Sequence, residues 1–481
     1  MNIYISGKEL DFDYGLHSLG TSFSGSPDVS ICKGTGDGLN VFYGENEATF
    51  SMGEHSLTVK FDENDRREAT NIIKAGAYKV LAAFYKKELP WGTLSGVRPT
   101  KIPMRMINEG YSDEEILKAL KEVYLISDEK NELGLKVAKK ESEILAPINV
   151  KDGYSLYIGI PFCPTTCAYC SFTSYPINAM KNKVDDYIFT LIYELEEVAK
   201  MFKEKTLQSI YIGGGTPTSI SAEQLDRLLS AVDLFFDRSN VLEYTVEAGR
   251  PDSITREKLE VIKNHNVSRI SVNPQTLNQK TLELIGRRHT VDQTIECFNM
   301  ARELGFTNIN MDFIVGLPGE SYEDLAYSME EVKKLNPDNL TFHALAVKRA
   351  GRIRSIQREG AQNEYEEKLL SSEITDEHMR LTEKTAAELG MEPYYLYRQQ
   401  SMTGSFENVG YATEGNEGIY NILMMEEVQS IVACGAGTVT KRVFEDEHIE
   451  RCDNVKDVNL YIEKIEEMIE RKRQLFSTIE C

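Results

Sequence analysis

Three cysteines lie within eight residues of one another, in the segment CPTTCAYC. Cys163, Cys167 and Cys170 are four and three residues apart, so their thiolates can converge on one metal group if the segment is a loop. An iron–sulfur cube normally takes four Cys ligands, and no fourth Cys lies nearby, which leaves one iron open. The amino and carboxylate groups of S-adenosylmethionine (SAM) can chelate such an iron, and an added electron then cleaves a C–S bond to give a 5′-deoxyadenosyl radical. We therefore predict a [4Fe–4S] cluster with SAM, and the spacing itself leaves a three-Cys zinc site as the alternative.

A glycine-rich turn and a set of polar side chains lie at the ends of the following predicted strands. Gly213–Pro217, GGGTP, ends the second strand, where missing side chains let backbone groups approach a ligand closely. A single glycine-rich turn is weak evidence for a binding site, because many such turns have no role beyond the turn itself. Glu247 ends the third strand, Gln275 follows the fourth and Asp312 lies in the fifth. Each could be a capping group, but together they predict a polar ring around one opening.

The elements that position these residues alternate between strand and helix from residue 155 onward. The predicted strands are 155–160, 207–213, 241–248, 268–273, 308–314 and 339–346. The predicted helices between them are 184–202, 221–236, 256–265, 278–285 with 291–305, and 321–335. This alternation predicts a parallel sheet with right-handed crossovers, in which chemistry lies at the carboxyl ends of the strands.

The flanking regions have different patterns. Residues 1–62 are predicted to form short strands, followed by helices over 65–89, 112–145, 371–390 and 458–476. The predicted fold class is α/β: a parallel (β/α)6 partial TIM-type barrel with an N-terminal α+β domain and a C-terminal mostly helical domain. The expected domains are an N-terminal accessory domain over 1–150, the barrel core over 151–360 and a substrate-covering domain over 361–481.

Composition excludes several classes of function. The chain has 481 residues, 41% of them hydrophobic, and a formal net charge of -22. Such an acidic surface repels a phosphate backbone, so we expect no nucleic-acid partner. We find neither a long uncharged apolar stretch nor an export signal, so we expect a cytoplasmic protein without a membrane span. The scattered Cys32, Cys297, Cys434, Cys452 and Cys481 are expected to be small buried residues.

The chain resembles the oxygen-independent coproporphyrinogen III oxidase family of radical SAM proteins in SLYIGIPFCPTTCAYCSF, YIGGGTP, VEAG, VNPQTLN, LIGRRH and MDFIVGLPGE. It resembles the HemZ branch of that family in SGVRPTK, ENVGYA and ACGAGT. The motif likeness covers about residues 150–350, and the HemZ likeness covers most of the chain.

The resemblance implies a role for each matched position. The cluster ligands would be Cys163, Cys167 and Cys170. Contacts to the SAM on the open iron would come from Tyr157, Gly214, Glu247 and Ala346. Oxidases of this family also bind a second SAM, and its contacts would come from Tyr169, Gly215, Thr216, Gln275, Arg287 and Asp312.

The reaction that the resemblance implies removes a hydrogen atom from the β-carbon of a propionate, and loss of CO2 and an electron then leaves a vinyl group. Done twice, it converts coproporphyrinogen III to protoporphyrinogen IX in haem biosynthesis. The implied cofactors are the [4Fe–4S] cluster and one or two SAM molecules. The implied partners are coproporphyrinogen III and a low-potential electron donor, and no catalytic side chain is expected beyond the cluster and SAM.

Two positions differ from the family pattern. Phe172 lies two residues after Cys170, where oxidases of the family usually have a further Cys, and Gly159 lies where they usually have His. The related haem chaperones share the Phe. The alternative functions are therefore a haem chaperone and a radical SAM protein that acts on another tetrapyrrole.

A substrate with four carboxylates needs local cations in so acidic a chain. Arg pairs well with carboxylates through two parallel hydrogen bonds. The candidates are Lys348, Arg349, Arg352, Arg354 and Arg358 after the sixth strand, and Arg287 and Arg288 after the first half of the fourth helix. A run of charges is more often a solvated face, and our hypothesis is that some of these residues bind propionates.

Overall fold

The computed structural model describes residues 1–10, 12–25, 28–347, 351–399, 406–446 and 448–477. These residues form two compact units. The first unit comprises Met1–Ser142, Ala344–Val347 and Pro393–Val409, and the second comprises Glu143–His343, Lys348–Glu392 and Gly410–Cys481.

The first elements of the chain, in order, are β1 (Asn2–Gly7), α1 (Asp13–Ser24), β2 (Ser30–Lys33), β3 (Leu39–Tyr43), β4 (Glu47–Met52), β5 (His55–Lys60), α2 (Arg66–Tyr85), α3 (Lys101–Asn108), α4 (Asp113–Glu122) and α5 (Asp128–Leu145). The sheet of the first unit has the order β2-β1-β3-β4-β5. Strand β1 runs parallel to β2 and β3, whereas β3, β4 and β5 form an antiparallel meander.

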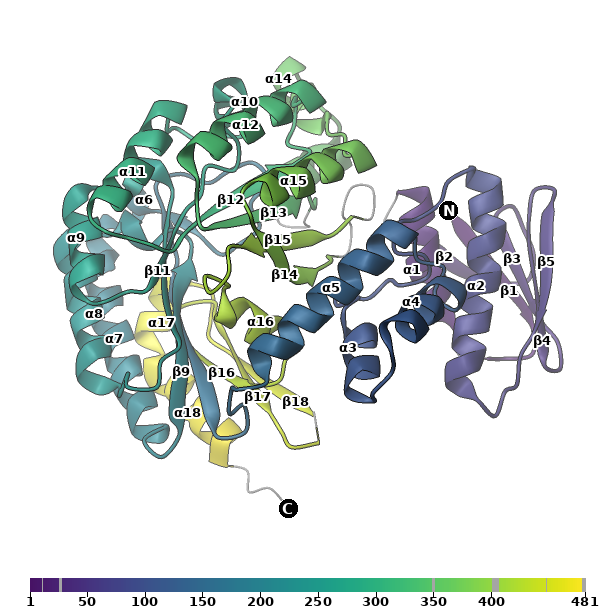
Figure 1. Cartoon of the computed structure of the whole chain (residues 1–481), viewed down its shortest axis with the longest axis horizontal. Helices are drawn as coiled ribbons and strands as arrows, with labels where there is room; N and C mark the ends of the chain where they lie inside the picture. Colours follow the sequence, from purple (N-terminus) through teal and green to yellow (C-terminus); the bar gives the residue numbers. More distant parts are fainter. Residues whose placement is uncertain (11, 26–27, 348–350, 400–405, 447, 478–481) are drawn as a thin grey trace. The chain divides into compact units, whose positions relative to one another are not determined.

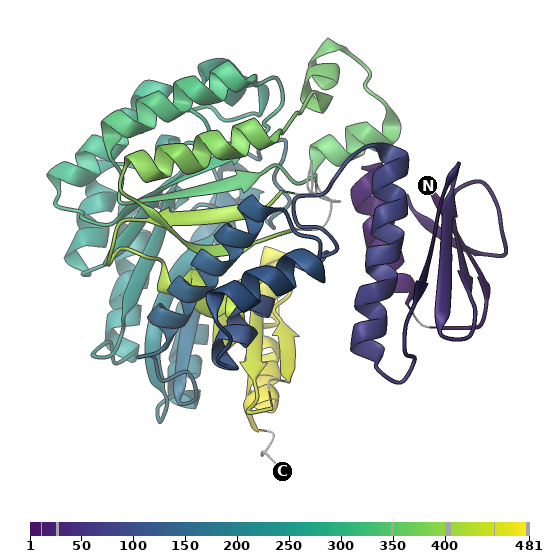
Figure 2. The ribbon, with the colours of Figure 1, turned by 45° about the vertical axis from the view of Figure 1, so that its right-hand side comes forward.

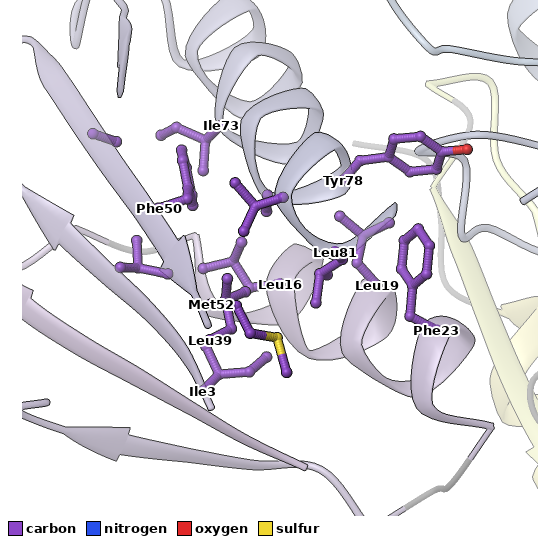
Figure 3. Close-up of a cluster of buried hydrophobic side chains, with 14 of the residues drawn as sticks. Ile3, Leu16, Leu19, Phe23, Leu39, Phe50, Met52, Ile73, Tyr78 and Leu81 are labelled. Atoms are coloured by element: carbon purple, nitrogen blue, oxygen red, sulfur yellow. The ribbon is translucent and has the colours of Figure 1, made fainter. Parts of the chain in front are cut away.

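The core of the first unit lies between this sheet and helices α1 and α2, which cover one face of it (Figure 2). Strand β4 alternates buried and half-buried residues, the two-residue period of a strand with one face on a core. Ile3, Leu16, Phe50 and Ile73 come from four different elements, point into the same cluster and are each 0% exposed (Figure 3).

Helix α1 corrects the prediction of strands alone over residues 1–62. Glycine and small polar residues lower the helix propensity of this segment, but Leu16, Leu19 and Phe23 have helical spacing and are buried. A Cβ on Gly20 would lie 3.1 Å from Cδ1 of Ile3, so the glycine permits close packing of helix on strand. The helix predicted over 112–145 is also divided, into α4 and α5, because Leu125 between them has a φ of 57°.

A buried polar cluster stabilises another part of the first unit. The indole Nε1 of Trp91 donates to Oε2 of Glu407 at 2.7 Å, and Nζ of Lys130 lies 2.8 Å from Oε1 of the same carboxylate. The side chain of Glu407 is 1% exposed. Burial of a carboxylate is tolerated here because both of its oxygens have partners.

The elements that follow are β6 (Gly153–Ile160), β7 (Phe162–Cys163), β8 (Tyr175–Pro176), α6 (Ile177–Met180), α7 (Val184–Met201), β9 (Thr206–Gly214), α8 (Ala222–Phe235), β10 (Glu243–Gly249), α9 (Arg256–Asn264), β11 (Arg269–Val272), α10 (Gln279–Leu284), α11 (Val291–Glu303), β12 (Ile309–Val315), α12 (Tyr322–Leu335), β13 (Asn339–Ala344), α13 (Arg352–Glu359), α14 (Glu364–Leu370), α15 (Asp376–Glu388), β14 (Glu392–Tyr397), β15 (Asn408–Ala412), α16 (Ile419–Glu426), β16 (Ser430–Cys434), β17 (Val439–Val443), β18 (Ile449–Asp453), α17 (Val458–Glu463) and α18 (Ile465–Ser477). Short 3-10 helices lie at Lys181–Lys183, Pro217–Ser219 and Pro251–Ser253.

The second unit is built on a parallel sheet, which confirms the predicted α/β fold class with its partial TIM-type barrel. Its strands follow one another in the order β13-β12-β11-β10-β9-β6-β16-β17-β18. The pairs β6·β9, β9·β10, β10·β11 and β11·β12 are parallel. Helices α7, α8, α9 and α11 lie on the outer side of these strands (Figure 1). This arrangement brings the carboxyl ends of the strands to one end of the barrel.

The C-terminal region adds strands that the sequence analysis did not predict. Strand β16 pairs in parallel with β6, with Cys434 opposite Ile158, and β17 and β18 continue the sheet in antiparallel fashion. Each of these strands has only five residues, so their periodicity is weak. Residues 361–481 are divided between the two units, and their role as a substrate-covering domain stays a prediction.

A buried ion pair connects α7 with α18. Oε1 of Glu194 lies 2.7 Å from Nζ of Lys472, and the two side chains are 0% and 1% exposed. The carboxylate also accepts hydrogen bonds from Nδ2 of Asn454 at 2.8 Å, from the hydroxyl of Tyr461 at 2.6 Å and from the backbone N–H of Gly435 at 2.7 Å. This network holds the turn after β16 in place.

The scattered cysteines differ in burial. Cys297 and Cys434 are buried, as expected, but Cys32 and Cys452 are only half-buried, which corrects the expectation for them. Cys481 lies outside the described residues. None of the helices in the described part of the chain has the length and hydropathy that a membrane span requires.

Candidate functional site

The three clustered cysteines lie on a loop directly after the first barrel strand. The loop begins with β7, which pairs with β8, and Cys163 and Cys167 are each 9% exposed. Burial raises the pKa of the Cys163 thiol, and it raises the pKa of Cys170 to about 11. The loop therefore holds Cys163 and Cys167 away from water at the carboxyl end of β6, whereas Cys170 is half-buried.

The glycine-rich turn after β9 lies against this loop. The backbone N–H of Gly215 donates to the carbonyl of Ile160 at 2.8 Å, and that of Thr216 donates to the carbonyl of Phe162 at 2.8 Å. Oγ1 of Thr216 lies 3.4 Å from Sγ of Cys163. A Cβ on Gly215 would lie 2.6 Å from the Phe162 oxygen and 3.0 Å from that Sγ, so only glycine permits this approach.

The LIGRRH turn after α10 supports the other side of the cysteine loop. The backbone N–H of Ala168 donates to the carbonyl of Ile285 at 3.0 Å, and Oγ1 of Thr165 donates to the carbonyl of Gly286 at 3.1 Å. The glycine-rich turn and the LIGRRH turn are far apart in the sequence, but both form hydrogen bonds with the segment that carries the cysteines.

Arg287 is buried beside the loop rather than free in solvent. Its Nη1 donates to the hydroxyl of Tyr169 at 3.0 Å, and its Nη2 donates to the carbonyl of Asn273 at 2.7 Å. Its Nε and Oδ1 of Asn273 are buried without a hydrogen-bond partner. Unpaired buried polar atoms are costly, and here they fit a polar ligand close to Tyr169.

Arg250 is a residue near the cysteines that the sequence analysis missed. It directly follows β10, is 4% exposed, and its Nη1 lies 3.7 Å from Sγ of Cys167. Burial lowers the pKa of Arg250, but the hydrogen bond to Asp252 and the charges of Cys167 and Cys163 raise it more, so the guanidinium is held charged. Its position at a strand end, the criterion that singled out Glu247, was the available signal.

The predicted polar ring is formed at the strand ends. The hydroxyl of Tyr211 on β9 donates to Oε1 of Glu247 on β10. Burial raises the pKa of Glu247 to about 7, although this hydrogen bond lowers it. Burial alone would also raise the pKa of Asp312, but His343 and Asn310 hold it below its usual value. Two neighbouring carboxyl groups therefore have different protonation at neutral pH.

Gln275 and a stack of tyrosines complete this end of the barrel. Gln275 has a φ of 70°, and its backbone N–H donates to the carbonyl of Asp312 at 3.0 Å. The rings of Tyr157 and Tyr211 are stacked with centroids 6.1 Å apart, and Tyr420 lies 4.5 Å from Tyr211. The sequence carried no signal for Tyr420, which comes from the distant α16.

The remaining predicted residues differ in how they are placed relative to the loop. Gly214 adopts a φ of 108° at the end of β9, and Ala346 belongs to the first unit. Arg352 on α13 lies 3.7 Å from Glu366. Arg288 lines a pocket of about 260 Å³ beside the loop, with Pro164, Thr165, Asp252 and Lys258 among the lining residues. Lys348 and Arg349 lie outside the described residues.

The two departures from the family pattern have distinct surroundings. A Cβ on Gly159 would lie 2.5 Å from Cγ2 of Thr438, so the turn after β16 occupies the space that a side chain would need. Phe172 is 76% exposed on the cysteine loop. Single exposed apolar side chains are ordinary on protein surfaces, and Tyr14 is exposed to the same extent, so exposure alone gives Phe172 no role.

The donor set at the loop is three thiols. Among the described residues, no group of three or more His, Cys, Asp or Glu side chains is close enough to hold a single metal ion. The three thiols and the unpaired buried atoms of Arg287 and Asn273 are compatible with a cluster and a polar cofactor.

Comparisons with known proteins agree with this arrangement. The radical SAM superfamily matches residues 157–332. The oxygen-independent coproporphyrinogen-III oxidase-like protein HemZ of Bacillus subtilis (strain 168) is 40% identical over 437 residues, which are 89% of this chain and 86% of that protein. The heme chaperone HemW of the same strain is 38% identical over 194 residues, which are 40% of this chain and 50% of the chaperone.

A solved structure shows the same fold. Coproporphyrinogen III oxidase (HemN) from Escherichia coli, a radical SAM enzyme, superposes with a TM-score of 0.51 and 20% identity, over 68% of this chain and 72% of that chain. At this identity the likeness extends to the fold alone.

Proposed function

Because the chain belongs to the radical SAM family of HemZ-like coproporphyrinogen-III oxidase-like proteins, we propose that it decarboxylates two propionates of coproporphyrinogen III without oxygen, giving protoporphyrinogen IX. The proposed cofactors are a [4Fe–4S] cluster and SAM, with a low-potential protein as the electron donor. The proposed reaction releases CO2 and one electron for each vinyl group formed.

The observation that carries this proposal is the contact between the cysteine loop and the glycine-rich turn. Thr216 lies 3.4 Å from the Cys163 sulfur, and a Cβ on Gly215 would lie 2.6 Å from the carbonyl oxygen of Phe162. The polar ring of Glu247, Gln275 and Asp312 lies at the same strand ends. A cluster on the loop would therefore lie at the same end of the barrel as these polar groups.

Each part of the site has a proposed role. Cys163, Cys167 and Cys170 would hold the cluster, whose fourth iron would bind SAM and supply a 5′-deoxyadenosyl radical. Tyr157, Gly214, Glu247 and Ala346 would bind that SAM. Tyr169, Gly215, Thr216, Gln275, Arg287 and Asp312 would bind a second one.

The charge pattern of the ring suggests how these residues would act. Glu247 is protonated over part of the neutral range and can donate a hydrogen bond, whereas Asp312 stays a carboxylate and accepts from donors such as an ammonium or ribose hydroxyl. Arg352 and its neighbours on α13 remain our proposal for binding propionates. Charge reversal at Arg349 and Arg352 should weaken porphyrinogen binding, and an unchanged affinity would refute that assignment.

The test is an anaerobic assay with a reductant, SAM and coproporphyrinogen III. We expect a tricarboxylic intermediate and then protoporphyrinogen IX, detected by chromatography. Cys167→Ser should abolish both the cluster absorption and turnover, because it removes one ligand. Cys297→Ser is the matched control, since Cys297 is equally buried but lies on α11. SAM cleavage without decarboxylation would refute the proposed substrate.

A haem chaperone is the second candidate. It is favoured by the likeness to HemW and by Phe172, because the related haem chaperones also have Phe at this position. Tight haem binding without turnover of coproporphyrinogen III, lost in Phe172→Ala, would support this function over the first.

A further inference from the structure

Arg250 contacts the cysteine loop from the barrel side. Its Nη1 donates to the backbone carbonyl and to Oγ1 of Thr165, both at 2.8 Å, and lies 3.7 Å from Sγ of Cys167. One guanidinium nitrogen thus binds the loop at two points and directs its positive charge toward one of the three thiols. Because the side chain is 4% exposed, water screens this charge little.

Asp252 fixes the orientation of that guanidinium. Nε of Arg250 donates to Oδ1 of Asp252 at 3.0 Å, and Nη2 donates to Oδ2 at 2.7 Å. This two-point pairing uses the planar fork of arginine, which lysine cannot reproduce. With Nε and Nη2 held by the carboxylate, Nη1 points at the loop without having to be ordered when a cluster binds.

We propose that Arg250 is a positioning residue that raises the reduction potential of the cluster bound at Cys167. The inference rests on the cluster of the proposed function. Reduction adds negative charge to the cluster and its thiolates, so a buried cation with an N–H directed at one sulfur stabilises the reduced state more than the oxidised one. A higher potential lets a given electron donor reduce a larger fraction of the clusters.

The surroundings reinforce the effect of Arg250. Thr165 and Asp252, which hold it, line the pocket of about 260 Å³ that Lys258 and Arg288 also line. Nζ of Lys258 donates to the carbonyl of Ser253 at 2.9 Å. Three cations and one carboxylate therefore surround this side of the loop in a chain whose net charge is -22. The local charge is therefore opposite in sign to the net charge of the whole chain, and it adds to the positive potential near the loop.

The experiment compares the full-length wild type, Arg250→Gln and Arg250→Lys after anaerobic reconstitution. Iron and sulfide are counted per chain, and the cluster is titrated with dithionite while its reduced form is followed by electron paramagnetic resonance. At the wild-type midpoint, we expect Arg250→Gln to raise the ratio of oxidised to reduced cluster at least tenfold, equivalent to about 59 mV for one electron. Arg250→Lys should shift in the same direction by less, because it keeps the charge.

The matched control is Arg302→Gln. Arg302 on α11 makes an ion pair of 2.7 Å with Asp338, the same length as the pair between Arg250 and Asp252, but has no described contact with the cysteine loop. It should leave the potential unchanged. An unchanged or higher potential in Arg250→Gln with full iron content would overturn the proposal. If that variant holds no cluster, Arg250→Lys decides, and a wild-type potential there overturns it.

These outcomes are separable from the proposed function. The readout is a potential, so it does not need turnover of coproporphyrinogen III. If the protein binds the cluster but leaves coproporphyrinogen III unchanged, the proposed substrate is refuted. The reduction potentials of the wild type and the Arg250 variants can still be compared in that case. A shift in Arg250→Gln in such a chain would support the proposal.

Discussion

The buried pair of Glu194 and Lys472 makes a demanding test of how the second unit is stabilised. Replacing Lys472 with Met keeps most of the side-chain volume but leaves the Glu194 carboxylate fully buried without its cation. Removing one partner of a buried pair typically costs about 3–5 kcal/mol. Three other donors, on Asn454, Tyr461 and Gly435, still contact the carboxylate, so we expect the lower end, about 3 kcal/mol.

The double variant isolates the ionic part of this cost. Glu194→Gln with Lys472→Met removes both charges, and the amide can still accept hydrogen bonds through its oxygen. We expect the double variant to lose about 1–2 kcal/mol less than the sum of the two single variants, which is a typical coupling for groups in contact. Lys464→Met is the surface control, because Lys464 pairs with Glu467 at 3.9 Å and is 47% exposed. It should change the unfolding free energy by no more than about 0.5 kcal/mol.

Urea unfolding of the full chain measures these differences, and two probes separate the units. Trp91 is the only tryptophan and belongs to the first unit, so its fluorescence reports that unit. Circular dichroism reports both units. Lys472→Met should shift the transition seen by circular dichroism and leave the fluorescence transition in place. A loss below about 1 kcal/mol, or a double variant that is no better than the sum, would refute the reasoning.

Three further predictions concern other sites. The pKa of Glu247 in the folded state is raised from 4.5 to about 7, so the stability of the wild type should fall as the pH rises from about 4.5 to 7 and should stay low above that pH. Glu247→Gln should remove this fall and should raise the free energy of unfolding by up to about 3 kcal/mol at pH 8. Parallel curves of stability against pH for the two proteins would contradict this prediction. Gly159→Ala should cost about 1–3 kcal/mol in urea unfolding, because its Cβ would lie 2.5 Å from Cγ2 of Thr438; adding Thr438→Ser should recover most of this, and no recovery would show that another contact is responsible. Trp91→Phe should lower the free energy of unfolding, followed by circular dichroism, by about 1–3 kcal/mol, because Glu407 loses a hydrogen-bond donor at 2.7 Å. A loss of no more than about 0.5 kcal/mol, which is typical of neutral substitutions, would argue against this prediction.

The parts of the molecule that depend on local pattern were predictable from the sequence. The barrel strands β6 and β9 to β13 are short apolar runs bounded by turns, and each predicted barrel strand overlaps an observed one. The cysteine spacing and the glycine-rich turn also carry their information within a few residues. The glycine at position 215 is a local requirement, because only a residue without a side chain lets this turn approach Phe162 so closely.

The parts that depend on contacts between distant segments were not predictable. In the sequence, Arg250 is an ordinary charged residue after a strand, and only the structure shows its contacts with Asp252 and Thr165. Tyr420 reaches the ring from α16, and no local period indicates that it stacks on Tyr211. Helix α1 was missed for a different reason, since its glycine and small polar residues hid the helical spacing of Leu16.

The pairing of β16 with β6 has a consequence for the order of events in the cell. Strand β6, which leads into the cysteine loop, pairs with β16, which is synthesised much later. The ion pair that holds the turn after β16 joins Glu194 and Lys472, which are 278 positions apart in the sequence. During synthesis on the ribosome, the barrel strands can therefore assemble while the cysteine loop still lacks one wall. The loop acquires its final surroundings only when the last helix has emerged, so metal insertion into a completed site is expected after translation rather than during it.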